Sequence, residues 1–327
     1  MNFKKYSVND SSKVFLWALL LPQVASILVA CVFTFIYKTQ EELVNSLAYL
    51  LVLSLIAQVC FCFIAFYYNK KNKFDFIKIS NIKQKINWVN ILICVGVALI
   101  CILGYVNFIN LVGFGLEKIG FELGGVSLPL NSVGWLILNV LILGVLPAVF
   151  EEVIFRGMIF NGLKNKGFVF ACLISSLMFA IEHLAIDQFV FQFIMGIVLS
   201  FIYEKTNSLV YPIITHFCNN FFVIIINYII NKTGRDFLSL DITKILNIII
   251  AVVLAIATSV VLYFILTKLL KNKKSNEMET QIIETNTVQS EKLNKDSNVE
   301  YNKKLLVISL VCGAVLWLLV TISSFKG

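Results

Sequence analysis

Three short stretches place acidic, basic and amide side chains inside runs that are otherwise apolar: VFEEVIFRG from residue 149, MFAIEHLA from 178 and YPIITHFCNN from 211. The polar groups of interest are Glu151, Glu152, Arg156, His183, His216 and Asn220. An ionisable group at mid-membrane costs about 2.5–3.5 kcal/mol on insertion scales, and such groups usually face the bundle interior. The chain has 2 histidines, and both lie in these runs, which indicates a functional site.

These side chains are of the types that catalyse hydrolysis. A glutamate in a low-dielectric setting beside an arginine can be poised as a general base for water. Neutral imidazoles can bind a metal ion or, with an asparagine amide, hydrogen-bond a developing oxyanion. Glu152 and Arg156 have the i,i+4 order that favours an ion pair within a helix. His216 and Asn220 are also four apart, so both project from one helix face.

Neighbouring residues have simpler readings. Pro147 removes a helical hydrogen bond just before the glutamate pair, which bends the helix or admits water. Glu182 is interpreted as a local partner of a motif residue or as a side chain that points toward polar loops. Gly196 is interpreted as a point of close helix packing. The sequence lacks the HExxH zinc signature, a GxSxG serine and paired membrane aspartates, and Asp187 is the only aspartate in the middle spans.

The elements that hold these groups are predicted to be membrane helices. The chain is 59% hydrophobic with a mean hydropathy of +0.87, and runs of about 20 apolar residues can each cross a bilayer. Lipid cannot satisfy backbone N–H and C=O groups, so a span must be a helix or part of a closed β-barrel, and runs of this length are helices. The fold class is therefore an all-α, polytopic transmembrane bundle of about 8–9 spans. The predicted spans are 14–36, 44–68, 88–108, 133–160, 168–185, 189–203, 209–230, 245–269 and 305–323.

The predicted topology brings the polar groups to similar depths. If all nine segments span, loops 161–167 and 204–208 share one face. At about 1.5 Å per residue, Glu151 lies about 15 Å from that face, His216 about 12 Å, Asn220 about 18 Å and His183 about 24 Å. Ordinary helix tilt can bring these depths into one layer.

Charge sets the predicted orientation. The net charge of +8 is concentrated in KKNKFDFIKISNIKQK from Lys70, and the positive-inside rule places this loop and the amino terminus in the cytoplasm. The excess of positive charge is thus a membrane signal, and no nucleic-acid partner is expected. The 8 cysteines all lie in apolar runs and are interpreted as small buried hydrophobes. Lysine- and asparagine-rich composition favours a bacterial plasma membrane protein.

Three parts divide the chain. Residues 1–269 form the predicted transmembrane core, with the motifs in 130–230. Residues 270–303 are polar and predict a flexible cytoplasmic linker. Residues 304–327 predict an accessory carboxyl-terminal membrane helix, and this segment is a candidate attachment for a membrane protein partner.

The three motifs in order resemble those of a known family. EEVIFR fits EExxxR, FAIEH fits FxxxH and HFCNN fits HxxxN. This order and spacing are similar to the CPBP family of intramembrane proteases, which includes CAAX prenyl proteases and bacteriocin-processing and immunity proteins. The resemblance covers about residues 130–230. It implies a helical bundle with a conical cavity that opens toward the cytosol.

The resemblance also implies roles for the residues. Glu151 looks like the base that activates water, and His183 its partner in handling water or a metal ion. His216 and Asn220 would stabilise the oxyanion. Glu152 and Arg156, the other two members of the catalytic set, would orient and tune Glu151. A divalent metal such as zinc is a candidate cofactor, with Glu151, His183 and His216 as a three-ligand set with one open position. The motif leaves metal-dependent and metal-free mechanisms open.

The sequence therefore favours an intramembrane endopeptidase that cuts peptide or membrane-protein substrates in contact with lipid. A second hypothesis is a non-catalytic membrane regulator, such as a bacteriocin-immunity protein or a scaffold for an envelope enzyme or kinase. A proton-coupled transporter is the third, since buried glutamates and histidines also relay protons, but the sequence shows no repeated halves.

Overall fold

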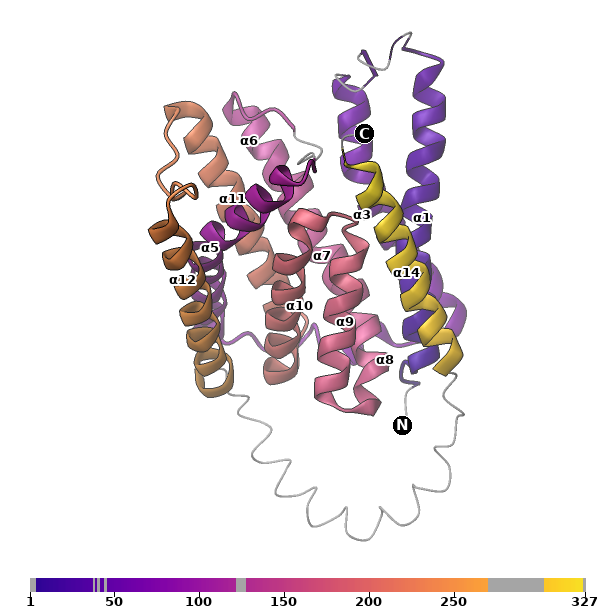
Figure 1. Cartoon of the computed structure of the whole chain (residues 1–327). Helices are drawn as coiled ribbons and strands as arrows, with labels where there is room; N and C mark the ends of the chain where they lie inside the picture. The colour runs from indigo at the N-terminus through magenta and orange to yellow at the C-terminus, as the bar shows by residue number, and fades with distance from the viewer. Residues whose placement is uncertain are drawn as a thin grey trace.

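The computed structural model describes residues 4–37, 39, 42–43, 46–121, 128–269 and 303–325. Its architecture is a bundle of helices (Figure 1). The helices are α1 (Val8–Thr34), α3 (Leu47–Asn72), α4 (Phe76–Ser80), α5 (Trp88–Lys118), α6 (Val133–Asn139), α7 (Leu146–Glu152), α8 (Asn161–Leu163), α9 (Phe168–Glu182), α10 (Ile186–Thr206), α11 (Val210–Thr233), α12 (Ile245–Phe264) and α14 (Lys303–Ser323).

The helices confirm the predicted polytopic bundle. Within the described residues, 8 helical segments are long and apolar enough to cross a membrane, so the chain is an integral membrane protein. The remaining predicted span, 168–185, corresponds to α9, which has 15 residues. At about 1.5 Å per residue this helix is about 22 Å long, short of a hydrocarbon core about 30 Å thick. The predicted pair of spans at 168–203 is thus one short and one full-length helix.

The amino terminus, the lysine-rich loop and the loop before α11 lie on one face of the bundle. Lys4 Nζ donates to the carbonyl of Asn72 at 3.2 Å. The Leu209 N–H donates to the Ser80 carbonyl at 3.0 Å, and Asn81 Nδ2 donates to the Asn207 carbonyl at 2.9 Å. The described carboxyl-terminal end of α14 lies toward the other face (Figure 1). This arrangement agrees with the predicted topology, whereas the cytoplasmic assignment of that face stays a prediction.

The helix that carries the glutamate pair is continuous but not uniformly α-helical. Two stretches of wide π-helical turns, η1 (Val140–Val145) and η2 (Val153–Phe160), flank α7. Pro147 lies in the first turn of α7, directly after the wide turns of η1. Single π turns within α-helices are frequent at functional sites, and here they bracket Glu151 and Glu152.

Helices α9 and α10 approach each other closely at Gly196. A Cβ atom at this position would lie 2.7 Å from Ser176 Cβ and 2.8 Å from Ser176 Cα. Because the obstacle includes backbone, a side chain at 196 requires the two helices to separate. The interpretation of Gly196 as a packing residue is therefore confirmed.

Replacing Gly196 with alanine is expected to destabilise the protein by about 1–3 kcal/mol through overpacking. Gly96→Ala in α5 is the matched control, because a Cβ there has nothing within 4 Å. This control is expected to stabilise the fold by about 0.5–1 kcal/mol. Thermal unfolding of both purified variants in detergent measures the difference, and equal midpoints would contradict the close approach at Gly196.

The last helix packs on the bundle itself. Helix α14 contacts α1 and α9, and a Cβ at Gly313 would lie 2.9 Å from Ile181 Cγ2. The Trp317 and Phe189 rings are 5.1 Å apart between centroids. The predicted linker lies outside the described residues except for its last residue, which begins α14. A partner protein for this segment stays a prediction.

Candidate active site

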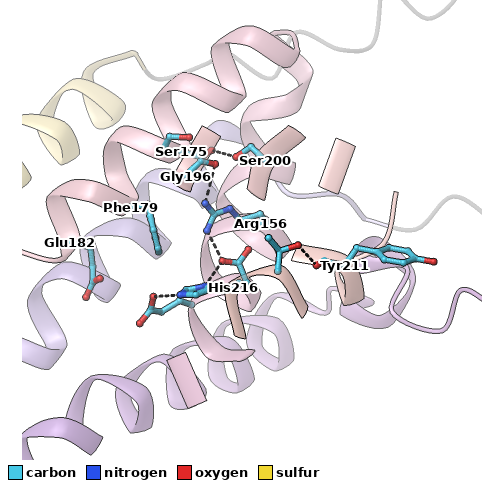
Figure 2. A network of polar contacts seen from close by, with 12 residues as sticks. Arg156, Ser175, Phe179, Glu182, Gly196, Ser200, Tyr211 and His216 are labelled. Atoms are coloured by element: carbon cyan, nitrogen blue, oxygen red, sulfur yellow. Dashed lines mark hydrogen bonds and ion pairs between the residues drawn. The ribbon is translucent and has the colours of Figure 1, made fainter. Parts of the chain in front are cut away.

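A buried ion pair forms the centre of the polar cluster. Arg156 Nη1 donates to Glu152 Oε1 at 2.7 Å, and both side chains are fully buried. Arg156 Nη2 donates to the Gly196 carbonyl at 3.1 Å, and the guanidinium lies 4.6 Å from the centroid of the Phe179 ring. Figure 2 shows Arg156 directed toward Gly196 on one side and toward the site on the other. The predicted pairing of Glu152 with Arg156 is confirmed.

His216 joins both glutamates from α11. Its Nδ1 lies 2.9 Å from Glu152 Oε1, and its Nε2 lies 3.9 Å from Glu151 Oε2 (Figure 2). Because a carboxylate can only accept, Nδ1 carries a proton that it donates to Glu152. The Nε2 atom of His216 is then directed toward the free oxygen of Glu151. The structure therefore brings together two motifs that are 64 residues apart, as the depth prediction requires.

Asn220 lies one turn after His216 on α11 and is hydrogen-bonded to the backbone of the helix that carries Glu151. Its Nδ2 donates to the Leu143 carbonyl at 3.2 Å. Four residues after Leu143 stands Pro147, which has no N–H to donate to that carbonyl. One amide proton of Asn220 is thus bound to the helix that carries Glu151, and the second remains for another acceptor.

His183 lies beside the pair rather than within it. Its Nδ1 is 2.8 Å from the Phe179 carbonyl and 3.6 Å from Glu182 Oε2, which supports the interpretation of Glu182 as a local partner. The carbonyl can only accept, so the proton is on Nδ1 and Nε2 is free. The Phe179 ring lies between the two imidazoles, 4.7 Å from His183 and 6.0 Å from His216.

The backbone after His183 is unusual. Leu184 has φ of 51°, a left-handed conformation that is uncommon for a bulky residue. Its N–H donates to the Ile181 carbonyl at 3.1 Å. This left-handed residue ends α9 directly after the histidine, where helices more often place glycine. Strain of this kind gathers at functional sites.

Sequence reasoning missed one member of the cluster. Gln58, in α3, donates from Nε2 to Glu151 Oε1 at 3.1 Å, and its side chain is buried. A glutamine in the middle of an apolar span was the available signal. Its partner is 93 residues away, so no local spacing could reveal the contact.

The site leaves acceptor atoms open. Glu151 Oε2 and Glu152 Oε2 are buried and have no hydrogen-bond partner among the described residues. A buried acceptor without a donor costs about 1–3 kcal/mol, so a water molecule or a substrate N–H is favoured there. Glu151 is 7% exposed, which leaves it reachable and largely desolvated.

The predicted metal ligands were compared with this geometry. Among the described residues, no group of three or more His, Cys, Asp or Glu side chains is arranged to hold a metal ion. Glu151 and His216 are adjacent, but His183 is not assembled with them into a ligand set. Metal ligation by Glu151, His183 and His216 therefore stays a prediction.

A groove adjoins the glutamate-bearing helix on its α3 side. Its volume is about 510 Å³, and its lining includes Cys62 and Phe66 from α3 and Phe150 and Val153 from the site helix. Lys70 and Lys73 also line it. The groove is mostly apolar and passes next to the residues that flank Glu151 and Glu152.

Comparison with known proteins places this site in a class. Residues 133–222 match the sequence model of the family described as Rce1-like, type II CAAX prenyl endopeptidase Rce1-like. The matched segment contains all three motifs, and the match confirms the resemblance to the CAAX-protease family that those motifs predict.

Three bacterial proteins are similar over the same part of the chain. YdiL of Bacillus subtilis, whose name describes a membrane peptidase, is 32% identical over 33% of this chain and 44% of its own length. The membrane-embedded CAAX protease MroQ of Staphylococcus aureus is 40% identical over 24% of this chain and 32% of its own length. The UPF0177 protein YxdF of Lactococcus lactis is 33% identical over 25% of this chain and 45% of its own length. The alignments thus span less than half of each relative. No solved structure matches the chain significantly.

Proposed function

We propose that the protein is a membrane-embedded endopeptidase that hydrolyses peptide bonds of membrane-associated peptides or proteins. The observation that supports this most directly is the contact of His216 with both glutamates of the EExxxR motif inside a buried network. The family match of residues 133–222 and the printed names of two relatives agree with this activity.

The proposed reaction uses Glu151 as the general base. Its open oxygen removes a proton from water, and the water oxygen attacks the scissile carbonyl carbon. His216, in its protonated form, donates from Nε2 to the oxyanion, and the free amide proton of Asn220 is a second donor. Glu151 then passes its proton to the leaving amine as the carbon–nitrogen bond breaks.

The remaining motif residues position these groups. Arg156 holds Glu152 through a charge-assisted hydrogen bond, and Glu152 in turn fixes the ring of His216. His183, with Nε2 free, is proposed to bind the attacking water on the α9 side.

The apolar groove beside Phe150 and Val153 supports a substrate with an extended apolar segment. MroQ is named a CAAX protease, and prenylated CAAX proteins are one candidate class for this chain. Hydrophobic bacterial peptides are the other class, and the groove suits both.

The test is cleavage of peptides by the purified protein in nanodiscs, read by mass spectrometry. His216→Ala is expected to lower kcat at least about 100-fold, the scale of one lost oxyanion donor. A chelator distinguishes the two mechanisms that the motif leaves open, and unchanged cleavage in its presence would support the metal-free mechanism. Loss of cleavage that zinc restores would instead support the metal-dependent mechanism.

The matched control is Glu117→Gln, which removes an exposed glutamate at the end of α5. It is expected to keep wild-type cleavage. Equal cleavage by wild type and by the Glu151→Ala, His183→Ala and His216→Ala variants would refute the protease and favour the non-catalytic regulator.

A further inference from the structure

Helix α3 contacts the EExxxR motif through the amide side chain of Gln58. Its Nε2 donates to Glu151 Oε1 at 3.1 Å, and the residue is 6% exposed. Helix α3 also packs against α7, so the contact joins two neighbouring helices at mid-bundle. The nearby face of α3 continues as Cys62, Ala65 and Phe66 along the groove.

The orientation of the Gln58 amide is fixed by its partner. A carboxylate accepts hydrogen bonds and cannot donate, so Nε2 must face Glu151. The Gln58 Oε1 atom then points elsewhere, and it is buried without a hydrogen-bond partner among the described residues. An apolar side chain of the same volume would avoid this penalty. Packing alone therefore does not explain a glutamine at this position.

The contact divides the two oxygens of Glu151. Gln58 engages Oε1, and Oε2 is left open at 3.9 Å from His216 Nε2. The terminal torsion of a glutamate is broad and roughly two-fold, so a carboxylate without such a donor samples many orientations. A base that must meet water in one geometry gains from having that torsion held.

We infer that Gln58 is a positioning residue for the proposed hydrolysis. It holds Oε1 of Glu151 so that Oε2 is presented to the attacking water and to His216. Gln58 exchanges no proton and touches no substrate atom in this role. The inference rests on the proposed function, since it assigns Gln58 to the same base.

The test compares kcat, KM and thermal stability of the full-length protein with those of Gln58→Met, which keeps the volume and loses the donor. The expected result is a kcat lowered about 10- to 100-fold, the effect of one hydrogen bond to a charged group. KM is expected to stay within about twofold, because the contact does not bind substrate. The unfolding midpoint is expected to stay equal or rise, because a buried unpartnered oxygen is removed.

Ser54→Ala is the matched control, because Ser54 lies one turn earlier on α3 and donates only within its helix, to the Leu50 carbonyl at 2.8 Å. It is expected to keep the wild-type kcat. A wild-type kcat in Gln58→Met overturns the inference, and so does a loss of kcat that is matched by a lower unfolding midpoint.

A double-mutant cycle separates this inference from the proposed function. In the Glu151→Gln background, Gln58→Met is expected to cause no further loss of the residual rate, since the two residues act as one unit. A further loss equal to that in the wild-type background overturns the positioning role. Full activity of Glu151→Gln alone would instead overturn the assignment of the base.

Discussion

Replacing Glu151 with glutamine is expected to lower kcat by about 10²- to 10⁴-fold, the range that a positioned general base contributes. Glutamine has the same shape but cannot take a proton from water. The side chain is 7% exposed, so a base from bulk solution has little access to replace it. Initial rates of peptide cleavage in nanodiscs measure the effect.

The fold of this variant is expected to survive. The side-chain carbonyl of glutamine can still accept from Gln58 Nε2, which donates to Glu151 Oε1 in the wild type. An unfolding midpoint near that of the wild type, together with the loss of kcat, would place the effect in the reaction. A kcat within tenfold of the wild type would show that Glu151 is not the base.

Replacing Arg156 with methionine is expected to destabilise the protein by about 3–5 kcal/mol, the cost of leaving a buried charge without its partner. Arg156 and Glu152 are both fully buried, and the arginine also satisfies the Gly196 carbonyl. This is the largest effect expected on stability. Thermal unfolding and the yield of monodisperse protein in detergent measure it.

The double variant Glu152→Gln/Arg156→Met tests the cause. It removes both charges but keeps an acceptor for His216 Nδ1, which lies 2.9 Å from Glu152 Oε1 in the wild type. Much of the lost stability is expected to return, because replacing a whole buried pair is often neutral. Cleavage is not expected to return. A double variant as unstable as Arg156→Met would mean that packing, rather than charge, explains the single loss.

The parts of the site that local geometry determines could be predicted from sequence. The Glu152–Arg156 pair follows from i,i+4 spacing within one helix. The meeting of Glu151 with His216 follows from similar depths in antiparallel spans, at about 1.5 Å per residue. These two contacts could be predicted because each involves only one or two helices.

Other contacts depend on which helices become neighbours, and no short-range pattern carries that information. Gln58 reaches Glu151 only because α3 packs against α7. Asn220 reaches the Leu143 carbonyl because α11 packs against η1, the π-helical stretch that carries Leu143. His183 lies where α9 ends at Glu182 and the chain turns at Leu184, and its Nδ1 is 2.8 Å from the Phe179 carbonyl.

The π-helical stretch after the glutamates has a consequence for helix register. In η2 the wide turns bring Asn161 Nδ2 to the carbonyls of Arg156 and Gly157, each at 3.1 Å, and to Tyr203 Oη. The same residues wound as a regular α-helix would rotate everything after the stretch by about 100°. Asn161 would then leave Tyr203, and Gly162 would leave the close contact that its missing Cβ permits with Ser11. The wide turns of η2 therefore set the rotation of the helix so that one face meets the buried charges and another face meets α1.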